Sequence, residues 1–247
     1  MGHPVARVKA PPAPPVRSPA QLAWDDVAES WADALRARVD PARAVADAAM
    51  VELIRQVPTG PVLDAGCGEG WLARELAAHR HRVTAFDGSP FMVELALREG
   101  PGTADYRLLT FGEAAAGPRR MGGAFGTVVF NFSLLEERIT PVLSAAGSVL
   151  FPYGRILIQA AHPASVLAEE PVAYRDGWRT VDEAAPGVAL PCPVPWYFRT
   201  FTTWVLELRR AGLLLVETYE PVDPATGRPV SLILSATIPE KRRKPEG

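Results

Sequence analysis

VLDAGCGEGWLA, residues 62–73, is the stretch that decides the fold of this 247-residue chain. Its apolar start ends in the acid Asp64, and three glycines then lead into a helical pattern that begins near Trp71. A strand, a glycine-rich turn and a helix in this order form a βα unit, in which the backbone can contact a ligand because glycine has no Cβ. The stretch therefore predicts an α/β fold with a ligand at the turn.

A dinucleotide site is the first alternative for such a turn. Its G-x-G-x-x-G fingerprint uses the third glycine for close packing of the helix on the strand. Counting from Gly66, that third position is Trp71, the bulkiest of all side chains. The acid before the glycines would also repel a pyrophosphate, whereas it suits a ligand that carries an ammonium group. The residues therefore disfavour a nicotinamide oxidoreductase.

Two stretches resemble motifs of the class I S-adenosylmethionine-dependent methyltransferases. VLDAGCGEG resembles their first motif, and VTAFDGSPFMVELA at residues 83–96 resembles their second. The resemblance implies a Rossmann-like, doubly wound α/β fold whose seven strands have the order 3-2-1-4-5-7-6. It also implies S-adenosylmethionine as cofactor and methyl transfer to an N, O or C nucleophile of a small organic acceptor. A non-catalytic S-adenosylmethionine-binding partner or regulatory protein is the alternative.

Composition indicates one domain with no nucleic-acid partner. The chain is 48% hydrophobic, and its 26 Lys and Arg nearly balance its 28 Asp and Glu. No apolar run reaches the roughly 18 residues of a membrane span, and the N-terminal stretch lacks the apolar core of a signal peptide. Cys67 and Cys192 lie far apart, so neither a disulfide framework nor a metal site is indicated. We expect a cytoplasmic protein without a membrane partner.

Domain boundaries follow from shifts in composition. Residues 1–20 are rich in proline and are expected to form a disordered tail, and residues 240–247 form a basic, solvated one. The methyltransferase domain is expected between them, over residues 21–239. Residues 114–123 are interpreted as a surface loop. The end of the domain is expected to be a closing antiparallel hairpin, residues 213–221 with 230–239.

Two helices are expected ahead of the glycine-rich turn, within residues 21–57. Trp24 and Trp31 lie on one face of the first, and Asp40-Pro41 supplies an N-cap and a first helical residue for the second. In the resembled family, such helices fold over the cofactor as a lid and shape the substrate pocket. Ordinary core packing of the two tryptophans is the alternative.

The resemblance implies that residues at the ends of the first two strands bind the amino-acid and ribose parts of the cofactor. Asp64 would lie near its ammonium group, Gly66 and Gly68 would let the backbone approach its methionine part, and Asp87 with Gly88 would hold its ribose. An acid at the tip of the second strand can accept hydrogen bonds from both ribose hydroxyls, whichever reaction follows. A helix N-cap is the compatible structural role of that acid.

The resemblance also implies that the adenine and the transferable methyl group of the cofactor lie near the ends of the third and fourth strands. Phe111 is the adenine candidate through its stacking capacity, although the family's usual acid is missing at Thr110; core packing is the alternative. Asn131 and Phe132 follow a buried strand that resembles the fourth motif, whose end faces the transferable methyl group. The Asn131 side chain could orient an acceptor nitrogen or hydroxyl, and the Phe132 ring could face the sulfonium.

The acceptor side is expected to come from the chain after the fifth strand. His162 lies just past that strand and could take a proton from the acceptor; a hydrogen-bonded loop histidine is the alternative. Residues 164–199 are rich in aromatic side chains and are interpreted as an inserted cap, with Trp196 and Tyr197 lining the acceptor site beside the tryptophans of the lid. A homodimer interface or a self-packed loop is the alternative for this segment.

Overall fold

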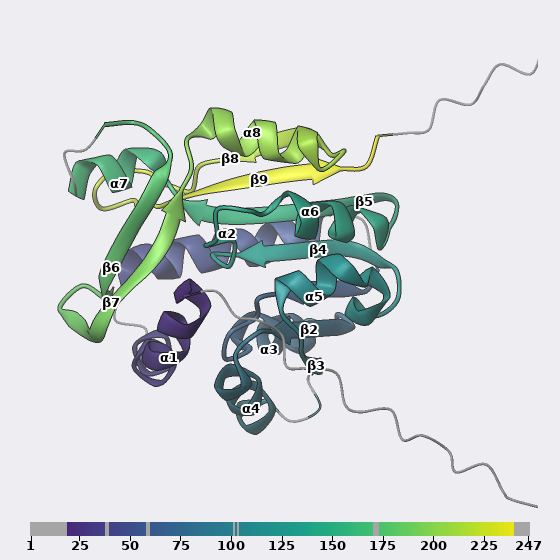
Figure 1. The fold of residues 1–247 in the computed structure, drawn as a ribbon, viewed down its shortest axis with the longest axis horizontal. Helices are drawn as coiled ribbons and strands as arrows, with labels where there is room; N and C mark the ends of the chain where they lie inside the picture. The colour runs from purple at the N-terminus through teal and green to yellow at the C-terminus, as the bar shows by residue number, and fades with distance from the viewer. Residues whose placement is uncertain are drawn as a thin grey trace, which may run out of the picture.

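A seven-stranded sheet forms the centre of the computed structural model, which describes residues 19–37, 40–57, 60–100, 102, 104–169 and 173–239. Its order is β3-β2-β1-β4-β5-β9-β8 (Figure 1). The pairs from β3 to β5 are parallel, and β9 runs antiparallel to both of its neighbours. Since β6 and β7 lie outside this sheet, the expected order 3-2-1-4-5-7-6 is confirmed. The strands are β1 Val62–Ala65, β2 Val83–Asp87, β3 Asp105–Leu108, β4 Phe125–Asn131, β5 Leu150–Ala161, β8 Leu214–Tyr219 and β9 Ser231–Thr237.

Helices bury both faces of this sheet. Successive residues of β4 show the division, because Val128 and Phe130 belong to one core cluster while Val129 belongs to the other. Helices α2 and α3 cover the Val129 face, and α5, α6 and α8 cover the opposite face. A parallel sheet that is buried on both faces is the doubly wound arrangement that the sequence predicted. The helices are α2 Pro41–Gln56, α3 Trp71–Ala78, α4 Pro90–Glu99, α5 Phe111–Ala116, α6 Thr140–Ser148 and α8 Phe201–Arg210.

Between β5 and α8 the chain leaves the sheet. It forms α7 (Pro163–Glu169) and then a separate antiparallel hairpin of β6 (Gly177–Ala185) and β7 (Val188–Phe198). The hairpin stands beside the carboxyl end of the central strands (Figure 1). It carries the aromatic residues of the inserted segment toward the edge where ligands bind in open α/β sheets.

Helix α1 (Pro19–Ala37) lies between this hairpin and α4 (Figure 1). On one side its Val27 shares a cluster with Leu190 and Val194 of β7. On the other side its Ala28 and Ala32 pack against α4. The helix is therefore held by apolar contacts on two opposite sides, over the carboxyl edge of the sheet.

The turn after β3 departs from the expectation of a surface loop over residues 114–123, which is wrong. Thr110 and Glu113 form a capping box that begins α5, and a 3-10 turn η1 (Pro118–Met121) follows. Ala114 and Met121 are both fully buried. The many small residues and the two arginines of this stretch suggest an exposed loop, although the buried Met121 attaches it to the core.

Both chain ends fall outside the described residues. The disordered-tail expectation for residues 1–18 and the solvated-tail expectation for residues 240–247 therefore stay predictions, whereas Pro19 and Ala20 belong to α1. Among helices in the described ranges, none combines the length and the apolar character that a membrane crossing requires.

We predict that Met121→Ala lowers the free energy of unfolding by about 2–4 kcal/mol, because the truncation leaves a cavity in the core under α5 and α6. Arg119→Ala, two residues earlier and exposed, is the matched control and should change it by less than about 0.5 kcal/mol. Urea denaturation followed by circular dichroism measures both. Equal effects of the two changes would contradict the buried position of Met121.

Candidate functional site

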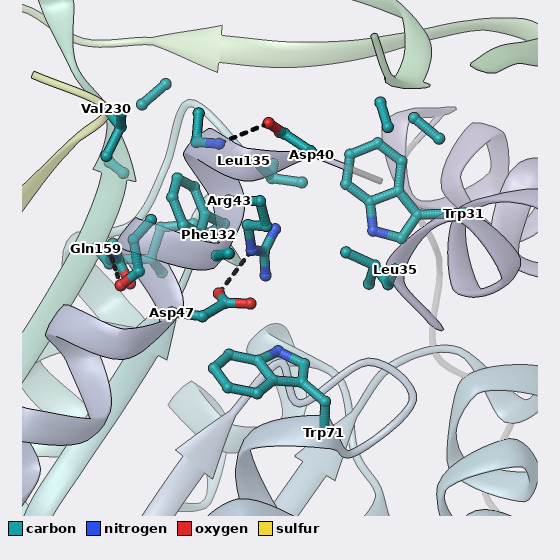
Figure 2. Close-up of a pocket in the computed structure, with 18 of the residues that line it drawn as sticks. Trp31, Leu35, Asp40, Arg43, Asp47, Trp71, Phe132, Leu135, Gln159 and Val230 are labelled. Atoms are coloured by element: carbon teal, nitrogen blue, oxygen red, sulfur yellow. Dashed lines mark hydrogen bonds and ion pairs between the residues drawn. The ribbon is translucent and has the colours of Figure 1, made fainter. Parts of the chain in front are cut away.

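Two cavities meet at the carboxyl end of the central strands. The smaller, of about 200 Å³, lies on the glycine-rich turn and is called the turn cavity here. The larger, of about 670 Å³, lies between α1, α2, α3 and the hairpin and is called the outer cavity (Figure 2). Residues that line both cavities form a shared wall: Trp24, Trp31, Leu35, Arg43, Glu69, Trp71, Phe132 and Leu135.

The glycines after β1 give the turn cavity its floor. Gly66, Gly68 and Gly70 have φ angles of 77°, 54° and 82°, a region that other residues rarely adopt. A Cβ at Gly66 would lie 2.4 Å from the Cβ of Ser133, so any side chain is excluded there. A Cβ added at Gly68 would have no other atom within 4 Å, so the backbone borders open space at that position. The turn thus leaves room for a ligand against its own backbone.

Asp87 ends β2 and ties the two strand ends together. Its Oδ2 accepts a hydrogen bond of 2.9 Å from the Gly68 amide, and its Oδ1 accepts one of 2.8 Å from the Ser89 amide. Burial raises the pKa of this carboxyl, and the two amide hydrogen bonds oppose the shift. Each carboxylate oxygen keeps a further acceptor position, so Asp87 can hold the turn and still accept from ribose hydroxyls.

Asp64 is the most constrained acid of the site. It is 1% exposed, and its Oδ2 is buried with no hydrogen-bond partner among the described residues. Burial, and then the negative charges of Asp87 and Glu69, raise its pKa from 3.8 to about 7. A buried carboxylate without a partner is costly, and a cation placed beside it would remove that cost. This fits the ammonium group that the sequence assigned to Asp64.

The remaining cofactor candidates also border the turn cavity, among them Gly88. Phe111 lines the turn cavity, and its ring also packs edge-on against Phe86, with ring centroids 5.8 Å apart. Core packing of Phe111 is therefore compatible with a place beside a ligand in the cavity. Asn131 is 9% exposed, and its Oδ1 has no partner among the described residues. Of Asp64 and Asn131, which each have an unpartnered side-chain oxygen, Asn131 lines the turn cavity, whereas Asp64 lines neither cavity.

Phe132 stands where the two cavities meet. Its φ of 52° is left-handed, an uncommon and strained conformation for a residue with a side chain. The Arg43 guanidinium carbon lies 4.7 Å from the centre of its ring. The Phe132 amide donates a 2.9 Å hydrogen bond to the carbonyl of Gln159 on β5. The aromatic ring is thereby aimed into the junction instead of into the core.

Arg43, on α2, was missed by the sequence reasoning. Its Nε donates a 2.7 Å hydrogen bond to Asp47, while no described acceptor is bonded to its two terminal nitrogens. Figure 2 shows the guanidinium between Trp31, Trp71 and Phe132. Because it lines the turn cavity, it could hold an anionic group such as the carboxylate of a bound amino acid. An arginine on a helix surface gives no sequence signal for such a role.

Four aromatic residues predicted for the acceptor side come together. Trp24 and Trp31 lie edge to face with ring centroids 5.0 Å apart, and the Trp24 indole donates to the Pro195 carbonyl at 3.2 Å. Trp196 and Tyr197 line the outer cavity from β7. The ring that argued against a dinucleotide, Trp71, is a further wall residue that the sequence reasoning did not place.

His162 is not brought to this site, although the sequence placed it there as a proton acceptor and a lining residue. It lines neither cavity. Its Nδ1 accepts a 3.1 Å hydrogen bond from the Ala164 amide, so Nε2 carries the proton and donates to Glu220 at 2.8 Å. The chain turns into α7 directly after β5, and this turn carries the imidazole away from the junction. The hydrogen-bonded loop histidine fits this geometry.

Comparison with known proteins identifies the same family as the first two sequence motifs. A family model described as a methyltransferase domain matches residues 62–154, so the resemblance drawn from the first two motifs is confirmed. The ubiquinone biosynthesis O-methyltransferase of Methylocella silvestris is 38% identical over 91 residues, 36% of this chain. That match spans only 32% of the length of this curated relative.

Solved structures share the fold across most of the chain. The 1,6-didemethyltoxoflavin-N1-methyltransferase of Burkholderia thailandensis has a TM-score of 0.58 at 21% identity and covers 92% of this chain and 93% of its own. The glycopeptide N-methyltransferase MtfA, in complex with S-adenosylmethionine, has a TM-score of 0.59 at 20% identity, and the match covers 82% of this chain and 96% of that protein. At these identities the likeness is one of fold.

We predict a pH-dependent effect of Asp64→Asn on stability. Because the pKa of Asp64 is raised to about 7, the folded chain binds a proton that the unfolded chain has lost between about pH 4 and pH 7, so stability falls as pH rises through this window. The variant lacks this loss. Its advantage over the native chain in unfolding free energy should grow by about 2–3 kcal/mol between about pH 5 and pH 8. Parallel pH profiles in urea denaturation would contradict the assignment.

Proposed function

Since this chain carries a methyltransferase domain of the class I S-adenosylmethionine-dependent type, we propose that it transfers the methyl group of S-adenosylmethionine to a small, ring-bearing organic acceptor. One observation supports this proposal: the cavity over the glycine-rich turn adjoins a larger, aromatic cavity, and Phe132 lines both of them. A cofactor in the first cavity and an acceptor in the second would therefore contact each other beside Phe132. Neither cavity alone would suggest a transfer reaction.

The residues of the turn cavity suit the cofactor by their chemistry. Arg43 would face its carboxylate, Asp87 and Gly88 would hold the ribose, and Phe111 would lie beside the adenine. Asp64 lines neither cavity, so it would act on the ammonium group through a bridging water. When bound, the cofactor supplies a methyl group on a positively charged sulfur, which is already a strong electrophile. The protein is then required mainly to position and to shield.

Positioning and exclusion of water are what the chain can supply. The acceptor would lie against Trp31, Trp196 and Tyr197, with the Phe132 ring and the Asn131 side chain at the reacting end. Holding two reactants in line can contribute about 7–11 kcal/mol to lowering the barrier. Because the mechanism depends mainly on positioning, it does not require His162 as a proton acceptor.

The inserted segment acts as the cap in this proposal, and α1 as the lid. The hairpin buries Leu190 and Val194 against Val27 of its own chain, which favours a cap over the dimer-interface alternative. Because α1 is held between the hairpin and α4, the walls of both cavities would be positioned together. The methyltransferase domain then comprises residues 21–239, as the sequence suggested.

Isothermal titration with S-adenosylhomocysteine and a transfer assay with labelled S-adenosylmethionine test the proposal. We expect micromolar or tighter binding of the first, and label transfer to at least one member of a panel of aromatic amines and phenols. Binding without transfer to any acceptor would favour the non-catalytic alternative. Thermal stabilisation by NAD and not by S-adenosylhomocysteine would favour the oxidoreductase instead.

We predict that Asp87→Ala weakens S-adenosylhomocysteine binding at least about 100-fold, because the change removes both the ribose acceptor and the brace of the Gly68 amide. Asp105→Ala, at the start of the neighbouring strand β3 and mostly exposed, is the control and should leave the affinity unchanged. Calorimetry on both variants, with melting temperatures to check folding, provides the measurement. Native affinity in a folded Asp87→Ala protein would refute the ribose assignment.

A further inference from the structure

Gln159 is a buried polar residue whose function the fold does not explain. It lies near the end of β5 and is 1% exposed. Its Nε2 donates a 2.9 Å hydrogen bond to the Ala46 carbonyl on α2 and a 2.8 Å hydrogen bond to the Ser231 hydroxyl on β9. Both amide hydrogens are therefore used. The opposite orientation of the amide would place Oε1 against the Ala46 carbonyl, so the neighbours fix which way the group points.

The oxygen of this amide is left without a partner. Oε1 of Gln159 is buried, and no described donor lies within hydrogen-bond reach of it. Buried carbonyl oxygens are nearly always paired, because burial removes the water that would otherwise bond them. The residue lines the outer cavity, as do the apolar residues Ala160 and Val166. Val230 lies on the same side of this cavity (Figure 2). A ligand donor that reaches this oxygen from the cavity would supply its missing partner.

Gln159 is also close to the junction of the two cavities. It pairs in register with Asn131 on β4, and its backbone carbonyl accepts the hydrogen bond from the Phe132 amide. A molecule bonded to Gln159 would therefore lie beside the ring that separates the cavities. The two strand ends present one amide to each cavity, Asn131 to the turn cavity and Gln159 to the outer cavity.

We propose that Oε1 of Gln159 accepts a hydrogen bond from an N–H or O–H group on the ring-bearing acceptor and so selects for acceptors that carry such a donor. This inference rests on the proposed function, because it concerns the molecule held in the outer cavity. Sites built around a fixed hydrogen-bonding group discriminate strongly against analogues that lack the matching group, since the protein partner is then left unpaired. Gln159 is a specificity residue in this account.

Two bicyclic probes of similar size test the proposal: indole, which has an N–H donor, and 1-benzothiophene, which has none. Binding is measured by ligand-observed NMR titration on protein saturated with S-adenosylhomocysteine. The native protein should bind indole about fivefold more tightly, the factor expected for one neutral hydrogen bond. Gln159→Met should bind both probes equally and keep its affinity for S-adenosylhomocysteine.

Ser231→Ala is the matched control, because it removes one hydrogen-bond partner of Nε2 but leaves Oε1 in place. It should retain the preference for indole, whereas a merely structural role of Gln159 would make both variants alike. The comparison of the two probes on the native protein needs no variant, so a poorly folding Gln159→Met does not remove the test.

Three results would overturn the inference. Equal affinity of the native protein for both probes would mean that a water or nothing at all uses Oε1. If a folded Gln159→Met protein still preferred indole, another residue would have to cause the preference. If indole did not bind at all, the outer cavity would not be a site for rings that carry an N–H donor. A native protein that does not bind S-adenosylhomocysteine would instead refute the proposed function itself.

Discussion

The hydrogen bond from the Gly68 amide to the Asp87 carboxylate is the constraint on which the site depends. It joins the turn after β1 to the end of β2, and it forms only because the parallel register sets these two strand ends side by side. With the turn held in this way, Gly66 packs too closely on Ser133 for any side chain, and the buried Oδ2 of Asp64 has no hydrogen-bond partner in the part of the chain that the structure describes. The ammonium site proposed at Asp64 therefore depends on the same turn.

The two cavities share much of their lining, so each depends on the other. Residues on five different segments face both of them, from Trp31 on α1 to Phe132 after β4, so a change in one wall alters both spaces. Helix α1 adds to this coupling, because opposite sides of it pack on the hairpin and on α4. A protein that has to hold two reactants in line gains from such a common wall, since neither reactant can shift without displacing the other's surroundings.

Sequence patterns predicted those features that are local or that alternate with a regular period. The glycine-rich turn, the acid of β2, the capped start of α2 and the final antiparallel strands all have short-range signals, and the strand order follows from the family resemblance. Arg43, Gln159 and Met121 have no such signal, because their importance comes from contacts with residues far away in the chain. His162 shows the converse: it follows the right strand, yet one sharp turn into α7 removes it from the edge.

Gln159 and His162 lie three residues apart, and they differ in whether the sheet holds the side chain. Gln159 still belongs to β5, where α2 on one side and β9 on the other supply the two acceptors that orient its amide. The antiparallel strand β9, inserted next to β5, pairs Ile233 with Gln159 and Ser231 with Ala161, which brings the Ser231 hydroxyl within hydrogen-bond reach of the Gln159 amide. The Gln159 amide has partners on both sides of its strand, whereas the hairpin contacts the rest of the molecule mainly through α1. The sheet itself, and not the cap alone, is thus equipped to discriminate between acceptors.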